Sequence, residues 1–186
     1  MGSNQITIKN KIMPQENLFA GDCIRTFTGK YVNVFDPDPN TLVIEDIAHA
    51  LSMQCRFGGH LPYFYSVAQH CVTCSTATEA EAPDPNLAFT ALMHDSSEAY
   101  LLDIPRPIKL KLANYKEIED KLMKALSLKF GFTYPLPEMV HTIDNVAIVS
   151  EWNAIMLPTE KLVHGLSNSE ARNRFLERYL ELKNRL

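Results

Sequence analysis

Apolar residues recur at helical spacing along most of this 186-residue chain, and this pattern limits the fold more than any other feature. The first apolar stripe begins at Ile44, includes Cys55 and predicts a helix that ends at Gly58-Gly59. Strand-like alternation is confined to residues 23–35, where Thr28-Gly29 predicts a hairpin turn. Further stripes predict helices over residues 63–78, 84–102, 114–131, 136–152 and 167–186. The pattern indicates an all-α fold with a small N-terminal β-hairpin.

Capping residues and prolines set the expected helix boundaries. Asp84 followed by Pro85 is a typical N-cap and first-turn pair. Pro105 and Pro107 predict an extended segment after that helix, because proline is unfavourable inside a helix and restricts the residue before it. Two further pairs predict capping boxes, namely Asn114 with Glu117 and Ser167 with Glu170. Gly131 is the expected C-terminal cap of the helix that begins at Asn114.

Composition bounds the class of protein. With 46% apolar residues, residues 21–186 are expected to form a single domain, and residues 1–20 an N-terminal extension that is partly disordered or left over from cloning. A formal net charge of −4 argues against bulk nucleic acid as a partner. No apolar run approaches the ~20 residues of a membrane span, and the polar N-terminus is unlike a signal peptide. The four cysteines do not form a secreted disulfide framework in a chain of this size, which predicts a reduced, cytoplasmic setting.

Several ionisable residues fall on faces that are otherwise apolar. His94, Asp95 and Glu98 follow an apolar run, and a buried helix gains nothing from them unless they are paired or bound to a cation. His70 lies on the apolar face of the preceding predicted helix, and Asp144 on that of the fifth. Two imidazoles and two carboxylates can converge on one divalent cation, and this mixed set suits a first-row transition metal. Spacing alone leaves open that His70 is a satisfied core histidine and that the His-Asp pair is a chance neighbour.

Cys71 and Cys74 form a C-x-x-C pair that raises a zinc or redox interpretation. A second pair, which a Cys₄ zinc site needs, is missing from the sequence. Both cysteines fall on the apolar stripe, so they are interpreted as small buried hydrophobic residues.

The ordered set of ligands resembles a known pattern. His70, then His94-Asp95, then Asp144 resemble the H…HD…D signature of the HD-domain phosphohydrolase superfamily, an all-α fold that binds a divalent metal. The segments CRFGGH and HDSSEAYLLDIPRPIK are similar to those of bacterial 5′-deoxynucleotidases and of phage-type deoxynucleoside triphosphohydrolases, including those that act on dATP. The resemblance covers residues 25–152. It departs from the deoxynucleotidases at Phe57, where they typically have tryptophan.

The resemblance implies a role for each matching residue. His70, His94, Asp95 and Asp144 would hold the metal, which would be cobalt, manganese, zinc, nickel or iron, with magnesium at an additional phosphate-bound site. The metal would lower the pKa of a bound water and so provide hydroxide for attack on phosphorus.

The remaining matching residues would handle the proton and the substrate. Glu98 would orient the water or carry its proton, and Asp103 would contact the sugar or assist the leaving oxygen. Arg56 and Lys109 would neutralise phosphate charge. The resemblance also implies three supporting contacts: Phe57 stacking on the nucleoside, His60 on a phosphate, and Pro107 stiffening one wall.

The expected function is therefore metal-dependent hydrolysis of a small-molecule deoxynucleotide. Of the two similar groups, the dATP-type triphosphohydrolases are favoured, because the TFTGKYVNVFDPDPN hairpin resembles theirs more closely. Two alternatives stay open: a 5′-deoxynucleotidase that releases phosphate from dNMPs, and a regulatory HD domain that binds nucleotides without turnover. A regulatory domain should have lost a ligand or Glu98, and none is lost. A cysteine-rich zinc module is disfavoured by the absent second Cys pair. The resemblance also implies a homo-oligomer, a dimer or larger.

Overall fold

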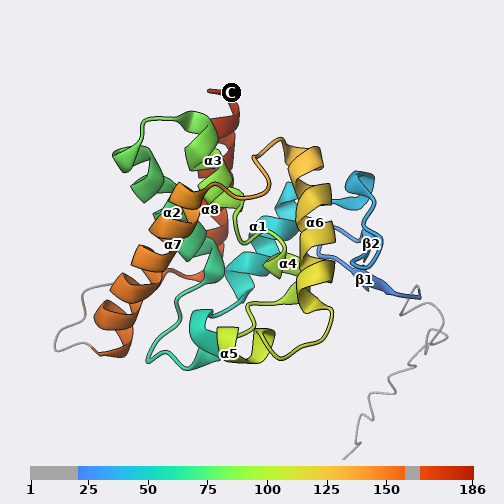
Figure 1. The fold of residues 1–186 in the computed structure, drawn as a ribbon. Coiled ribbons are helices and arrows are strands. Elements are labelled where there is room, and N and C mark those ends of the chain that lie inside the picture. Colours follow the sequence, from blue (N-terminus) through green and yellow to red (C-terminus); the bar gives the residue numbers. More distant parts are fainter. Residues whose placement is uncertain (1–20, 158–163) are drawn as a thin grey trace, which may run out of the picture.

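A computed structural model describes residues 21–157 and 164–186, so the expected extension over residues 1–20 lies outside the described residues. Helices dominate the described chain, and one antiparallel β-hairpin is seen at the right of the view (Figure 1). This confirms the predicted all-α fold with a small N-terminal hairpin. No helix among these residues combines the length and apolar character that spanning a membrane requires.

The elements are β1 (Cys23–Arg25), β2 (Tyr31–Asn33), η2 (Pro39–Thr41), α1 (Ile44–Met53), η3 (Arg56–Gly59), α2 (Val67–Glu81), α3 (Pro85–Met93), α4 (Glu98–Leu101), α5 (Arg106–Lys109), α6 (Tyr115–Phe130), α7 (Glu138–Glu151), the π-helix η4 (Trp152–Met156) and α8 (Asn168–Lys183).

The hairpin is anchored to α1 by a side chain. Ile24 pairs with Val32 across the two strands, and Gly29 supplies the positive φ of 85° that the connecting turn needs. Asp46 accepts hydrogen bonds from the Thr28 backbone N–H at 2.7 Å and from its hydroxyl at 2.8 Å. The predicted turn at Thr28-Gly29 is confirmed, and the buried Asp46 fixes it against the helical body.

The first helix ends earlier than predicted. It stops at Met53, and Cys55 leaves the helix to form an isolated β-bridge with Ser66. The short helix η3 follows, with Phe57 at a φ of 55°. The prediction that this helix runs to Gly58-Gly59 was wrong, because the backbone of Gln54 is extended and ends the helix. Arg56 then lies inward, with only 7% of its surface exposed.

The second helix begins later than predicted, at Val67 rather than near residue 63. Ser66 is its N-cap, and its hydroxyl accepts the Gln69 N–H at 3.1 Å. The predicted buried face is confirmed, since Val67, His70, Cys71 and Cys74 are all buried.

The predicted continuous third helix is interrupted at the His-Asp pair. α3 has the expected Asp84 cap but ends at Met93, and α4 begins only at Glu98. The His94 ring donates from Nδ1 to the Ala91 carbonyl at 2.7 Å, and this carbonyl would otherwise accept the backbone N–H of Asp95. The side chain therefore replaces a backbone bond and turns Asp95 and Glu98 out of simple helical register.

Two further boundary predictions were wrong and two are confirmed. The Pro105–Pro107 segment is not extended, because Pro107 sits in the first turn of α5, where a missing N–H costs little. The predicted capping box of Asn114 with Glu117 is absent, since Asn114 has a φ of 62° and its side chain makes no capping hydrogen bond. The predicted capping box of Ser167 with Glu170 is present, and Gly131 ends α6 in the left-handed region, as predicted.

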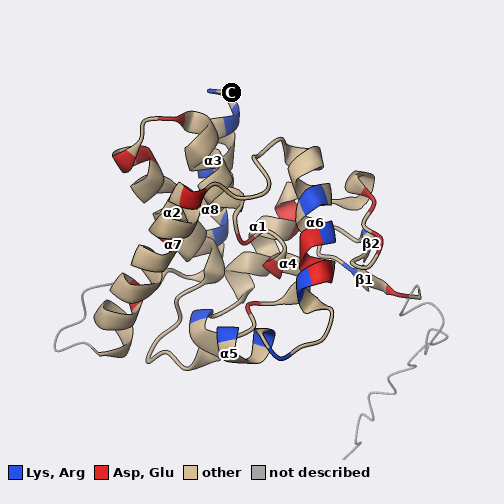
Figure 2. Cartoon of the chain, in the orientation of Figure 1, with Lys and Arg blue, Asp and Glu red and all other residues tan. Residues whose placement is uncertain are grey.

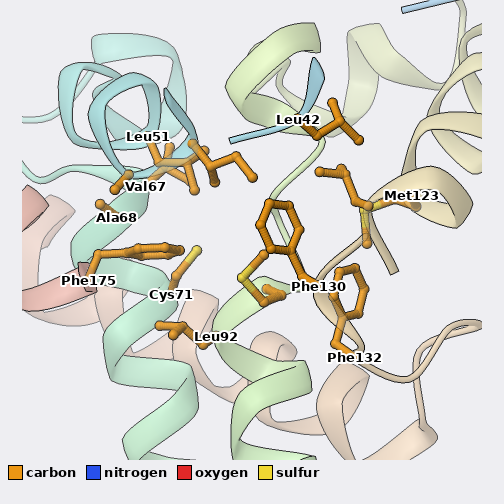
Figure 3. Close-up of a cluster of buried hydrophobic side chains, with 14 of the residues drawn as sticks. Leu42, Leu51, Val67, Ala68, Cys71, Leu92, Met123, Phe130, Phe132 and Phe175 are labelled. Carbon is orange, nitrogen blue, oxygen red and sulfur yellow. The ribbon is translucent and has the colours of Figure 1, made fainter. Parts of the chain in front are cut away.

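The hydrophobic core packs against one side of α2 and so holds this helix in place, whereas His70 lies on its other side. α2 packs against α1, α3, α7 and α8. Figure 3 shows the core between α2 and its neighbours α1, α3 and α8, with Met123 and Phe130 contributed by α6 and Cys71 between Phe175 and Leu92. The opposite flank of α2 faces α7 through His70. The core thus fixes the helix that carries the first candidate ligand.

Candidate metal centre

Four side chains converge at the junction of α2, α7 and the turn between α3 and α4. His70 Nε2 lies 3.0 Å from Asp144 Oδ1 and 3.7 Å from Asp95 Oδ2. His94 Nε2 lies 3.2 Å from Asp95 Oδ2 and 3.6 Å from Asp144 Oδ1. The structure therefore brings together all four residues that the sequence suggested as ligands. We call them the quartet.

Both imidazoles present the same nitrogen to the quartet. A carbonyl or a carboxylate oxygen only accepts, so the nitrogen bonded to it carries a proton. His94 Nδ1 bonds the Ala91 carbonyl at 2.7 Å, and His70 Nδ1 bonds Glu151 Oε1 at 2.7 Å. The two Nε2 atoms face the other quartet members, and a cation would replace the proton through which His70 Nε2 bonds Asp144 at 3.0 Å.

The quartet passes a test of fit for a divalent cation. His94 Nε2 is buried and has no hydrogen-bond partner among the described residues, since its geometry toward Asp95 is poor. Ligands about 2.1 Å from one ion are separated by about 3.0 Å at octahedral and about 3.4 Å at tetrahedral angles, and the donor separations given above span this range. His70, Cys74, His94 and Asp144 offer ligating atoms that all lie within 4.8 Å of one another, and Asp95 forms a second such group with Cys71 and His94. The described chain thus contains a buried His/Cys/Asp group that could bind a metal ion.

Charges within the quartet reinforce one another. Burial alone would raise the pKa of Asp144, but a hydrogen bond from His70 and the charge of the nearby His94 hold this pKa well below its ordinary value. Burial would lower the pKa of His94, yet the adjacent Asp95 charge and Asp144 raise it well above its ordinary value. Without a cation, the two carboxylates therefore favour protonated imidazoles, and an incoming cation has to displace those protons.

Arg56 lies beside the quartet at the start of η3. Its guanidinium is 3.2 Å from Glu151, 3.8 Å from Asp95 and 4.0 Å from Asp103. The guanidinium also lies 5.5 Å from the centre of the Phe57 ring. Burial would lower the pKa of Arg56, but the surrounding carboxylates raise it, so the side chain is a fixed positive charge.

An aromatic wall continues from Arg56. The Phe57 ring meets Trp152 edge-on, with ring centres 5.8 Å apart. Phe57 has the left-handed backbone conformation, which is unusual for a residue with a bulky side chain. Trp152 stands at the start of the π-helix η4, and such helices are frequent at functional sites.

Glu98 and Lys109 form a second charged group next to the quartet. Lys109 Nζ lies 3.6 Å from Glu98 and 2.6 Å from Glu119. Figure 2 shows the basic residues of α5 below α4, in agreement with this contact. Glu98 Oε2 is buried without a hydrogen-bond partner among the described residues. Burial, together with the negative charges of Asp95 and Asp103, raises the pKa of Glu98 well above its ordinary value.

The other predicted site residues divide into two groups. Asp103 approaches Arg56, and burial raises the pKa of its carboxyl group. Gln54 holds this segment in place, since its side chain accepts the Asp103 N–H and donates to the Glu98 carbonyl, both at 2.9 Å. His60 and Pro107 are exposed, and no contact between them and the quartet is found in the described chain.

Sequence reasoning missed three residues around the quartet: Glu151 and Cys74 contact His70, and Tyr65 contacts Glu151. Glu151 and Tyr65 form a buried hydrogen-bonded pair at 3.1 Å beside His70. Cys74 Sγ lies 3.5 Å from His70 Nε2, so this thiol borders the quartet as well as the core. Glu151 could have been noticed, because it follows Asp144 by seven residues and therefore shares its helix face.

Known proteins place the chain in a family. No protein-family model matches it. The chain is 43% identical over 145 residues to the uncharacterized protein YfdR of Escherichia coli (strain K12), a match that covers 78% of this chain and 74% of YfdR. It is also 34% identical over 118 residues to an uncharacterized protein of Rhodobacter capsulatus, covering 61% of this chain and 60% of that protein. The chain belongs to the same family as YfdR.

Proposed function

We propose that this protein is a metal-dependent phosphohydrolase of the HD-domain type that acts on deoxynucleotides, with deoxynucleoside triphosphates of the dATP type as preferred substrates. The observation that carries the proposal is the quartet, in which two imidazole Nε2 atoms face two carboxylates, with one of these nitrogens buried and unpartnered. A purely structural cluster would be expected to pair that nitrogen.

The quartet residues His70, His94, Asp95 and Asp144 would hold the cation. When bound, the cation supplies Lewis acidity that makes water a usable nucleophile near neutral pH. Nitrogen and oxygen donors favour a first-row transition metal such as cobalt, manganese, zinc, nickel or iron over calcium. The nearby thiol of Cys74 points in the same direction, since it adds a soft donor within reach.

Arg56 and Lys109 would bind the phosphates. Arg56 carries a planar fork of donors that matches phosphate oxygens, and the carboxylates around it keep that fork charged and in place. Lys109 would act as a point charge, and its contact with Glu98 connects the phosphate side of the site to the proton-handling side.

Glu98 would carry the proton. A carboxyl group works best as an acid or base when its pKa lies near the working pH, and burial raises the pKa of Glu98 in that direction. Asp103, whose carboxylate lies 4.0 Å from Arg56 Nη1, would contact the sugar or assist the leaving oxygen. Phe57 with Trp152 would pack against the nucleoside.

A product assay tests the proposal and its main alternative. Each of the four dNTPs and four dNMPs is incubated with Mn²⁺ or Co²⁺, and nucleoside, phosphate and triphosphate are separated. The proposal expects a deoxynucleoside and inorganic triphosphate from dATP, because water adds across the bond between the 5′ oxygen and the first phosphorus. Phosphate released from dNMPs alone would favour a 5′-deoxynucleotidase, and nucleotide binding without products would favour a regulatory domain.

A further inference from the structure

We propose that Glu151 is a positioning residue that couples the cation side of the site to its phosphate side. One of its carboxylate oxygens orients the His70 ring, and the other holds the Arg56 guanidinium. The inference rests on the proposed function, because it takes His70 as a ligand and Arg56 as a phosphate contact.

Glu151 is surrounded by donors rather than by water. It is 4% exposed, and a carboxylate this deeply buried has to be compensated by hydrogen bonds or charge. Oε1 accepts from His70 Nδ1 at 2.7 Å and from the Tyr65 hydroxyl at 3.1 Å. Oε2 accepts from Arg56 Nη2 at 3.2 Å. The two oxygens therefore serve different parts of the site.

The contact with His70 decides which ring nitrogen keeps its proton when a cation binds. Both nitrogens bond carboxylates, Nδ1 that of Glu151 and Nε2 that of Asp144 at 3.0 Å, so both carry protons without a cation. A cation in the quartet would replace the Nε2 proton, whereas the Glu151 oxygen retains the proton on Nδ1. A carboxylate behind a ligating histidine also fixes the rotation of the ring and strengthens the ring as a donor. Glu151 thereby prepares His70 for a cation without touching the cation itself.

The contact with Arg56 decides which guanidinium N–H groups remain available to a phosphate. Glu151 occupies Nη2, whereas Nη1 is directed toward Asp95 at 3.8 Å and Asp103 at 4.0 Å, beyond ordinary hydrogen-bond distance. The guanidinium is thus held at one end and has donors available at the other. A phosphate that enters beside Asp95 would meet an arginine whose orientation is already fixed.

The position of Glu151 on α7 explains how one residue reaches both sides. Glu151 follows Asp144 by seven residues, so both project from the same face of α7 toward α2. His70 lies between them, bonded to Asp144 through one nitrogen and to Glu151 through the other. A single helix face thus supplies a candidate ligand and the residue that orients the opposite ligand.

Glu151→Gln tests this role, because glutamine keeps the size of the side chain but replaces one acceptor with a donor. If the amide oxygen faces His70, the amide NH₂ faces Arg56 and repels its donors. If the amide is reversed, the NH₂ faces His70 Nδ1 and moves the ring proton to Nε2. Either arrangement damages one side of the site.

The measurements are calorimetric titrations with Co²⁺ alone and, on the Co²⁺-loaded protein, with inorganic triphosphate. In Glu151→Gln at least one of these two affinities should fall by about tenfold or more, as is usual for the loss of a residue that orients a metal ligand. Tyr65→Phe is the matched control, because it removes the second donor on Oε1 and leaves both coupling contacts intact. Both of its affinities should stay within about twofold of the wild-type values. Unchanged affinities in Glu151→Gln, or equal losses in Tyr65→Phe, would overturn the proposal.

Glu151→Asp supplies a second variant in case the glutamine variant does not fold. It keeps two accepting oxygens on a shorter side chain, so it should keep more of the Co²⁺ and triphosphate affinity than Glu151→Ala. Equal affinities in these two variants would contradict a role for the carboxylate. Turnover is not needed for either readout, so failure of the proposed hydrolysis in the wild type would be distinguishable from failure of the Glu151 role.

Discussion

Some of the residues in and around the quartet could be predicted from the sequence, and others could not. The four suggested ligands were predicted from their helix faces together with the resemblance to HD-domain phosphohydrolases, and the roles of Arg56 and Glu98 were predicted from that resemblance. The supporting contacts of Glu151, Tyr65 and Cys74 depend on how α2 and α7 pack against each other. Periodicity identifies a buried face but not which polar atoms meet across it, so these residues became visible only in three dimensions.

At the residue scale, a variant of Glu98 distinguishes a role in the hydrolysis step from a role in cation binding. Glu98→Gln keeps the shape of the side chain and all four quartet residues, so Co²⁺ should bind as in the wild type. Turnover of dATP should fall by roughly two to four orders of magnitude, the usual worth of a positioned acid–base group. Metal content and kcat are measured on the same preparation. Loss of Co²⁺ would make Glu98 a ligand, and normal turnover would make it an ordinary buried carboxyl group.

Elements of the fold were predictable where local chemistry determines them. The caps at Asp84 and Ser167 and the left-handed Gly131 were predicted, because each depends on neighbouring backbone groups. The interruption between α3 and α4 was not, because it depends on the bond between the His94 ring and the Ala91 carbonyl, which no apolar periodicity reports. The same bond fixes the tautomer of a candidate ligand, so the missed boundary and the site share one cause.

Between elements, α2 and α8 are joined by a charged network whose strength should depend on pH. Glu79 contacts both Arg178 and Arg185, and these hydrogen bonds lower its pKa. A group whose pKa is lowered in the folded state contributes stability above its unfolded pKa and loses this contribution as pH falls through the folded value.

The matching variant is Glu79→Gln. At pH 7 it should lower the free energy of unfolding by about 1 kcal/mol or less, since the network is near the surface and solvent screens it. The difference from the wild type should disappear well below the ordinary pKa of a glutamate. Urea unfolding curves at pH 7 and at acidic pH measure it, and a difference that grows on acidification would refute the assignment.

For the whole molecule, a cation in the quartet would link distant parts of the chain. Its candidate ligands come from α2, the turn after α3 and α7, which are far apart in sequence and separate in unfolded chains. A ligand that binds only the folded state stabilises it by mass action, by about 2.7 kcal/mol at a hundred times Kd.

Co²⁺ at that excess should therefore raise the Tm of the metal-stripped protein by roughly 5–10 °C, since about 1 kcal/mol corresponds to a few degrees in a protein of this size. Ca²⁺ at the same concentration should raise it less, because Ca²⁺ prefers oxygen ligands throughout. Differential scanning calorimetry gives both values. Equal shifts with the two ions would indicate binding at surface carboxylates instead of the quartet.

The most direct test of the account measures Co²⁺ content and dATP hydrolysis together in the wild type, in Asp95→Ala and in His141→Ala. His141 is the control, since it is an exposed imidazole on α7, the helix that carries Asp144. The account predicts that Asp95→Ala loses bound Co²⁺ and hydrolysis together, whereas His141→Ala keeps both at wild-type levels. Full hydrolysis with a full complement of Co²⁺ in Asp95→Ala would contradict it.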